Sequence, residues 1–182
     1  MGELAERFAR ELGADVQAVD LSPRMVELTQ SRGIEAQVAD IQRLPFPDGV
    51  FDCVVAAWVL YHLPEVDAGV AEIDRVLRPG GHLVAATVGE RNLSEVWDLV
   101  GGEATRDLSF GPENGEEVLR RRFASVERVD AEGTLVFPDT DAVRKFVAMT
   151  ITRAHLARDV PPLTEPLRAR TSHVIFVAAK SQ

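Results

Sequence analysis

Residues 51–88, FDCVVAAWVLYHLPEVDAGVAEIDRVLRPGGHLVAATV, decide the fold of this chain. The stretch opens with an apolar run, which predicts a strand within residues 51–60 that is buried on both faces in the middle of a parallel sheet. Apolar residues at helical spacing over 66–77 predict an amphipathic helix, and the turn-forming RPGG at 78–81 ends it. Residues 82–88 then predict a second strand. A strand, a helix and a strand in this order form a right-handed crossover within a parallel sheet.

The same alternation runs upstream. The pattern predicts a helix over 3–12 that ends at Gly13, a strand over 15–19, a helix between Ser22 and Gly33, and a strand over 34–39. Such a chain folds as an α/β domain with helices on both faces of the sheet. Small molecules bind outside the carboxyl ends of strands in these sheets. Asp20, Asp40 and the 56–62 stretch follow three predicted strands, so we expect a small-molecule site there.

The second half of the chain has a different character. Residues 91–100 and 113–123 predict helices, and residues 125–137 are strand-like with a turn at Ala131-Glu132-Gly133. Asp139 is typical of a helix cap, and residues 172–179 predict a last strand. Two late strands after a parallel set favour a hairpin-like edge. The helix after Asp139 is expected to turn five side chains inward: Val143, Phe146, Val147, Thr150 and Ile151.

Composition excludes several functions. The 182 residues suffice for one domain, 46% are hydrophobic, and the net charge is −9. Nucleic acid is a disfavoured partner because its binding depends on excess Lys and Arg, and the basic run 120–122 is expected to form salt bridges with acidic residues before it. The longest apolar run, 53–61, is too short to span a membrane.

Cys53 is the one cysteine and is expected to fill a buried strand. Because no internal disulfide can form, the sequence favours the cytoplasm. No residues have metal-ligand spacing.

The runs AVDLSPRMVELTQSRG (18–33) and VADIQRLPFPDGVFDCVVAAWVLYHLPEVDAGVAEIDRVLRPGGHLVAAT (38–87) resemble the core of the ubiquinone/menaquinone-type methyltransferases, which are class I enzymes that use S-adenosylmethionine (SAM). The resemblance covers residues 2–89. It implies a Rossmann-like fold with a mostly parallel sheet, an antiparallel last strand, SAM as cofactor and a small-molecule acceptor. Residues 1–182 would form one domain, with 90–182 on the substrate side.

The resemblance assigns cofactor contacts to five residues. Asp20 would accept hydrogen bonds from both ribose hydroxyls, as a carboxylate can. Leu21 and Met25 would pack on the adenine, although ordinary core packing explains them equally well. Asp40 would accept from the adenine amino group and the Ile41 backbone amide would donate to a ring nitrogen. The alternatives for the two aspartates are a surface loop and a turn or helix cap.

Further residues follow the fourth family strand. The resemblance places the backbone carbonyls of Ala56 and Ala57 near the methionine ammonium, and it makes Trp58, Tyr61 and His62 a wall toward the acceptor. His62 either orients the substrate or acts as a catalytic base. Its structural alternative is a hydrogen bond at a helix end. Trp58 is alternatively core or pocket lining. Parts of 91–155 complete the acceptor site, and the segment 92–110, with Trp97 and Phe110, is expected to supply a partial lid.

The resemblance also implies an absence. The family begins with a central strand and a G-x-G-x-G loop that approaches the methionine part of SAM. Here Gly2 matches the last glycine of that loop, and the strand before it is missing. The family sheet order is 3-2-1-4-5-7-6, so a gap of ~10 Å would open between its second and fourth strands. Either those strands slide together, or another segment fills the gap, or the sequence is a shortened form of a longer protein, which we expect.

Three functions follow from these patterns. The first is a SAM-dependent methyltransferase acting on a small molecule, impaired in SAM binding by the missing loop and prone to self-association through unpaired strand edges. The second is a non-catalytic methyltransferase-like domain that acts through weak ligand or protein binding. A nucleotide-binding oxidoreductase is the third, but the glycine fingerprint of such enzymes is absent.

Overall fold

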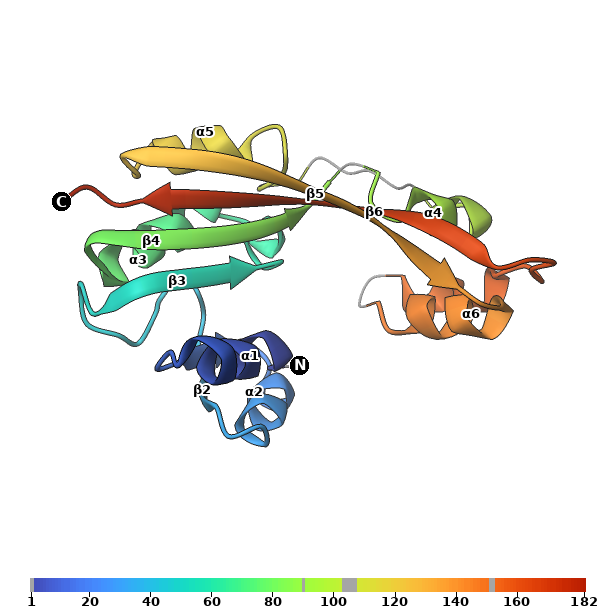
Figure 1. The fold of residues 1–182 in the computed structure, drawn as a ribbon, viewed down its shortest axis with the longest axis horizontal. Helices are drawn as coiled ribbons and strands as arrows, with labels where there is room; N and C mark the ends of the chain where they lie inside the picture. Colours follow the sequence, from blue (N-terminus) through green and yellow to red (C-terminus); the bar gives the residue numbers. More distant parts are fainter. Residues whose placement is uncertain (1, 90, 103–107, 151–152) are drawn as a thin grey trace.

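The computed structural model describes residues 2–89, 91–102, 108–150 and 153–182. Its strands form two separate sheets, and Figure 1 shows the four strands of the larger one. The first sheet has two parallel strands, β1 (Gln17–Asp20) and β2 (Glu35–Val38). The second has the order β3-β4-β6-β5, with bounds β3 Phe51–Ala57, β4 Leu77–Val88, β6 Leu167–Ala179 and β5 Ser125–Phe137. β3 and β4 are parallel, and β6, the last strand of the chain, is antiparallel to both neighbours, as the sequence predicts.

Local signals in the sequence set the ends of the first two helices. α1 (Glu3–Leu12) ends at Gly13, whose left-handed backbone (φ 64°) lets its N–H donate to the Phe8 carbonyl. α2 (Pro23–Gln30) begins after Ser22, whose hydroxyl accepts from the Met25 backbone N–H at 3.4 Å. Both helices confirm their predictions. α1 has no buried residue, so little of its apolar face is covered.

One face of the four-stranded sheet carries the main core. α3 (Val66–Val76) and α5 (Gly115–Arg120) pack on this face, and the 3₁₀ helix η1 (Leu60–His62) closes one end. Burial of these apolar side chains is the main force that stabilises the unit. The largest fully buried members are Leu60, Val70, Ile73, Leu77, Leu83, Phe110, Leu119 and Phe176.

β5 and β6 form one long antiparallel ladder from Ser125↔Ala179 to Phe137↔Leu167. The predicted turn at 131–133 is therefore wrong. Gly133 lies inside the ladder opposite Thr171, and a Cβ at this position would lie 2.8 Å from the Thr171 hydroxyl oxygen. The glycine thus permits a close approach between strands and does not mark a turn.

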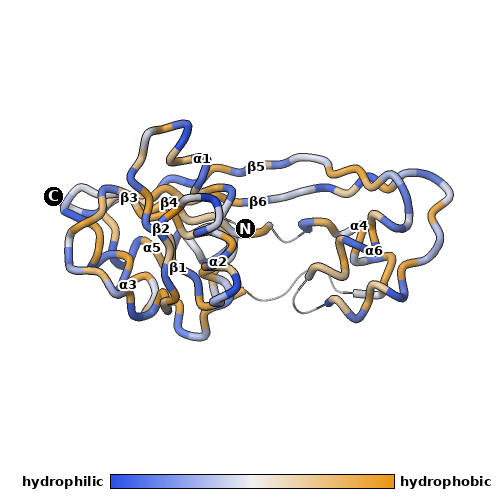
Figure 2. Tube along the Cα trace, turned by 90° about the horizontal axis from the view of Figure 1, so that it is seen from below, coloured by the Kyte–Doolittle hydropathy of each residue, from blue (hydrophilic) through white to orange (hydrophobic). Residues whose placement is uncertain are grey.

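A second core lies at the far end of this ladder, around the helices that Figure 2 shows at that end. There α4 (Ser94–Leu99), α6 (Thr140–Ala148) and the 3₁₀ helix η2 (Ala154–Asp159) gather around Phe137 and Ala169. Asp139 caps α6 as predicted, with its Oδ1 accepting from the Ala142 N–H at 2.8 Å. Ile151, expected to face inward, lies outside the described residues. Because alternate residues of β6 face opposite sides, the two cores lie on opposite faces of the sheet.

β3 is an edge strand, which corrects the prediction of a strand in the middle of the sheet. In the described residues β3 pairs only with β4, and β1 pairs only with β2. β1 and β3, which correspond to the second and fourth family strands, have therefore not moved together to close the gap. Cys53 and Val55 are consequently exposed, and the prediction that Cys53 fills a buried strand is wrong. Burial on both faces requires covering layers that an apolar run does not itself supply.

The helices within the described ranges are too short or too polar to cross a membrane.

Candidate functional site

Two aspartates come together at one edge of the small sheet. Asp20 is the last residue of β1, and Asp40 lies two residues after the end of the parallel neighbour β2. The Ala39 N–H donates to the Asp20 carbonyl at 3.1 Å, which holds the two strand ends side by side. The first pair of predicted cofactor residues therefore shares one rim, as expected for parallel strands.

Each of these carboxylates is held by its own loop. The Oδ1 atom of Asp20 accepts from the Ser22 N–H at 2.8 Å, and Oδ1 of Asp40 accepts from the Gln42 N–H at 2.9 Å. Among the described residues, neither Oδ2 atom makes a hydrogen bond. One oxygen thus fixes each side chain while the other remains an acceptor for a ligand.

The other residues predicted for the nucleoside side surround this rim. Leu21 is 65% exposed and lies directly after Asp20, while Met25 is half-buried in the first turn of α2. Gly2 precedes α1 with φ 72°, and a Cβ there would lie 2.8 Å from the Thr29 hydroxyl oxygen. Gly2 therefore packs the start of α1 closely against α2, and only glycine fits both the backbone and the space.

A second group of predicted residues lies at the carboxyl end of β3. Ala56 is buried, Ala57 is half-buried, and Trp58 follows with 45% of its surface exposed. Tyr61 and His62 belong to η1, with ring centroids 4.3 Å apart. Burial raises the pKa of the Tyr61 phenol, which therefore stays protonated at neutral pH. His62 is exposed at the end of η1.

The two groups belong to different sheets. β1 and β2 make at most marginal contact with the four-stranded sheet. Ile41 is the predicted residue that links the groups, because it follows Asp40 and packs against the main core beside Gly69. The structure therefore brings Asp20 and Asp40 together on one rim and places Ala57 and Trp58 on the other sheet.

Ion pairs hold the segment between β2 and β3 on α3. The Glu72 carboxylate accepts from the Leu44 N–H at 2.8 Å and from the Arg75 guanidinium at 2.8 Å. Arg75 also donates to the Phe46 carbonyl at 2.8 Å and to Asp48 at 2.7 Å. Hydrogen bonding to Arg75 is the main reason that the pKa of Glu72 is lowered. Glu72 and Arg75 thus form a clamp that fixes the segment between Ile41 and β3.

We expect Glu72→Gln to reduce the free energy of unfolding at neutral pH by about 1 kcal/mol, since a charge-assisted bond becomes a neutral one in a partly exposed site. Because the pKa of Glu72 is lowered in the folded state, its carboxylate stabilises the fold at pH values above the ordinary glutamate pKa of about 4.3. This contribution is lost as the pH falls below that value. The difference between wild type and variant should therefore shrink in acid. Urea unfolding at several pH values measures it, with exposed Glu127→Gln as control. A difference independent of pH would contradict the clamp.

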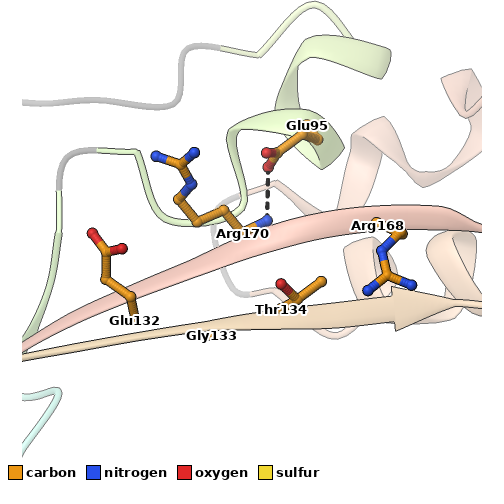
Figure 3. A pocket seen from close by; sticks show the side chains of 6 residues that line it. All are labelled: Glu95, Glu132, Gly133, Thr134, Arg168 and Arg170. Atoms are coloured by element: carbon orange, nitrogen blue, oxygen red, sulfur yellow. Dashed lines mark hydrogen bonds between the residues drawn. The ribbon is translucent and has the colours of Figure 1, made fainter.

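A hollow of about 480 Å³ lies elsewhere, on the β5–β6 ladder (Figure 3). Its lining is polar and charged, and the Arg170 backbone N–H donates to the Glu95 carboxylate at 3.0 Å. Small-molecule sites are usually apolar with few polar groups, so this open hollow is not the candidate site. Sequence reasoning gave no signal for it. The lining residues are Glu95, Glu132, Gly133, Thr134, Arg168 and Arg170.

Trp97 and Phe110 do not contribute to the partial lid that was expected from the segment 92–110. Trp97 is buried in the second core, where the Arg153 guanidinium lies 4.4 Å from its ring centroid, and Phe110 is fully buried in the main core. Neither ring is available to cover a ligand. Residues 103–107 of the same segment lie outside the described residues.

One contact near the site escaped the sequence analysis. The Trp58 indole N–H donates to His173 Nδ1 at 3.3 Å, and the two rings meet edge to face with centroids 5.7 Å apart. His173 lies on β6, 115 residues later in the chain. No motif or spacing signals a pair so distant in sequence, because only the strand order brings the two side chains together.

Acidic and small residues at strand ends of an α/β fold form the kind of rim at which such sheets bind small molecules. Residues 1–85 match the family model described as a methyltransferase domain. The ubiquinone/menaquinone biosynthesis C-methyltransferase UbiE of Pseudomonas putida strain F1 is 38% identical over 159 residues, which cover 80% of this chain and 59% of that protein. The chain belongs to the class I SAM-dependent methyltransferases. It spans about three fifths of the length of this relative.

Solved structures support the fold along the whole chain. The N-methyltransferase NodS from Bradyrhizobium japonicum WM9, in complex with S-adenosylhomocysteine, gives a TM-score of 0.59 at 18% identity and covers 100% of this chain and 74% of its own. The [4+2]-cyclase SpnF gives a TM-score of 0.64 at 21% identity, covering 99% of this chain and 71% of its own. At such identities the likeness concerns the fold, and the second name shows that this fold also carries other reactions.

Proposed function

We propose that the chain acts as a SAM-dependent methyltransferase on a small-molecule acceptor, with both sheets contributing to one domain. The observation that carries the proposal is the pair of carboxylates, Asp20 and Asp40, held on one rim with an oxygen of each available. Two acceptors at neighbouring strand ends suit the hydroxyl and amino donors of an adenosine. The match to the methyltransferase family and to UbiE supports the same assignment.

The proposed cofactor residues divide by the part of SAM that they would hold. Asp20 takes the ribose hydroxyls, and Asp40 with the Ile41 backbone amide takes the adenine edge. Leu21 and Met25 offer apolar surface to the adenine face, and the exposure of Leu21 suits a residue that a ligand covers. The other proposed cofactor residues, Gly2, Ala56 and Ala57, shape the backbone near the methionine end.

The acceptor side is proposed at Trp58, Tyr61 and His62. SAM supplies an activated methyl group, so the chain's own contribution is to orient the acceptor and to exclude water. Protonated Tyr61 can donate a hydrogen bond. Exposed His62 can orient the acceptor or, as the proposed catalytic residue, remove a proton from it.

A specific observation favours the second candidate, a methyltransferase-like domain without turnover. The nucleoside-side and acceptor-side residues lie on separate sheets with marginal contact between them. Calorimetry with SAM, S-adenosylhomocysteine and NAD separates the candidates. Binding of S-adenosylhomocysteine together with a methylated product in metabolite extract, detected by mass spectrometry, supports the enzyme. Binding without any product supports the second candidate, and binding of NAD alone contradicts both.

The exposed edges and the free thiol extend the proposal to the cellular setting. Cys53 is an exposed free cysteine, which suits a reducing cytoplasm. The open edges of β1 and β3 suit self-association, since unpaired N–H and C=O groups pair readily with another chain. Analytical ultracentrifugation over a range of protein concentrations tests this part.

We expect Asp20→Ala to weaken S-adenosylhomocysteine binding by roughly 1.5–3 kcal/mol, about ten- to a hundredfold, because a charge-assisted hydrogen bond is lost. Isothermal calorimetry at fixed ionic strength measures the change. Asp15→Ala is the matched control, since Asp15 is an exposed aspartate before the same strand. Unchanged affinity in Asp20→Ala, or an equal loss in both variants, would remove the ribose assignment.

A further inference from the structure

Trp58 holds an unusual backbone conformation at the edge of the proposed acceptor site. Its φ is +56°, in the left-handed region, which bulky side chains adopt rarely and at a cost of roughly 1–3 kcal/mol. Its N–H donates to the Ala86 carbonyl at 2.9 Å, which fixes the residue at the end of β3. Strain of this kind persists where the surrounding structure requires it, and it is concentrated at functional sites.

The strained backbone delivers the indole to one particular acceptor, the Nδ1 atom of His173. An indole N–H only donates, so Nδ1 must accept and carry no proton. The proton of neutral His173 then lies on Nε2. Within the described residues Nε2 has no hydrogen-bond partner, so its N–H is available to a ligand.

The surroundings of His173 keep it neutral. Its cross-strand neighbours on the same face are Val88 of β4 and Ala131 of β5, and along its own strand they are Thr171 and Ile175. In the described part of the chain no charged or titratable group of β3, β4, β5 or β6 adjoins the ring on this face. Burial accordingly lowers the pKa of His173.

We propose that His173 is an acceptor-binding residue whose Nε2–H donates to an oxygen of the methyl acceptor, and that Trp58 is its positioning residue. The proposal rests on the proposed function, because it takes Ala57, next to Trp58, as the end of the site nearest the methyl group. A hydrogen-bond donor with no adjoining carboxylate to occupy it suits a carbonyl or phenolate oxygen on a planar acceptor, which can also lie on the exposed indole. In this tautomer His173 is a donor and not a base.

Two probes, para-nitrophenolate and nitrobenzene, differ by the phenolate oxygen with its negative charge and test this assignment. We expect the wild type to bind para-nitrophenolate about tenfold or more tightly than nitrobenzene, and His173→Phe to lose this preference, because a hydrogen bond to a charged oxygen is removed. Nitrogen NMR of the histidines should show the His173 proton on Nε2. In Trp58→Phe that tautomer preference should fall, along with part of the probe preference.

The control is His82→Phe, since His82 lies on the same sheet face opposite Ala179, at the other end of β4. It should keep the probe preference. A proton on Nδ1 in the wild type, a preference that survives in His173→Phe, or no preference in the wild type would each overturn the proposal. Titrating the probes with and without S-adenosylhomocysteine distinguishes a failure of the methyltransferase proposal from a failure of the His173 proposal. Failure of S-adenosylhomocysteine to bind the wild type counts against the methyltransferase function, whereas the tautomer and the probe preference decide the role of His173.

Discussion

Phe176→Ala should lower the free energy of unfolding by about 3–5 kcal/mol, a large part of the ~5–15 kcal/mol that a domain of this size possesses. Phe176 is fully buried on β6, and its ring meets Phe110 edge to face with centroids 5.5 Å apart. A Cβ added at Gly115 would lie 2.6 Å from the Phe176 ring, so α5 rests directly on it. Truncation leaves a cavity between the sheet and this helix.

Urea unfolding, followed by tryptophan fluorescence and by circular dichroism, measures the change through the transition midpoint at constant slope. Val129→Ala is the control, because Val129 is an apolar side chain 50% exposed on the neighbouring strand. It should change stability by less than ~0.5 kcal/mol. A loss below about 1 kcal/mol in Phe176→Ala would mean that the sheet and α5 do not share one packed core.

Features that depend on a few neighbouring residues were predictable. Ser22 and Asp139 cap their helices as expected, because a cap needs only a side-chain oxygen and the N–H groups two or three residues later. The alternation of strands and helices gave the α/β class, and the family resemblance gave the antiparallel last strand. The rim position of Asp20 and Asp40 followed too, since parallel strands end at one edge.

Features that depend on distant partners were not predictable. Cys53 looked buried because its run is apolar, but exposure depends on whether a strand lies beside β3. Gly133 looked like a turn residue, yet it serves a close approach to Thr171 across the ladder. The Trp58–His173 contact exists only because β6 follows β4 in the sheet. In each case the local sequence leaves the partner undetermined.

The open edges of β1 and β3 lead to the last prediction. Within the described residues each strand is paired on one side only, and the proposed nucleoside and methionine ends of the site lie on opposite sides of the gap. A strand between them would satisfy backbone groups on both edges and join the two sheets. A glycine loop after that strand would bring N–H groups to the charged methionine end, which needs hydrogen-bond partners once desolvated.

We therefore expect an N-terminal extension consisting of an apolar strand and a G-x-G-x-G loop to raise SAM affinity by about a hundredfold or more, through two or three hydrogen bonds to charged groups. The thermal transition should also sharpen and move upward, because ligand contacts and strand pairing then depend on one cooperative unit. Calorimetry with SAM and differential scanning calorimetry measure the two effects.

The matched control carries the same loop after a strand with prolines at alternate positions. Proline has no N–H to donate, so this strand cannot complete either ladder. If the proline control binds SAM as well as the apolar extension, the loop acts alone and the gap is irrelevant to binding. If the 182-residue chain already binds SAM at micromolar concentration and melts cooperatively as a monomer, the two sheets form a working site without a strand between them.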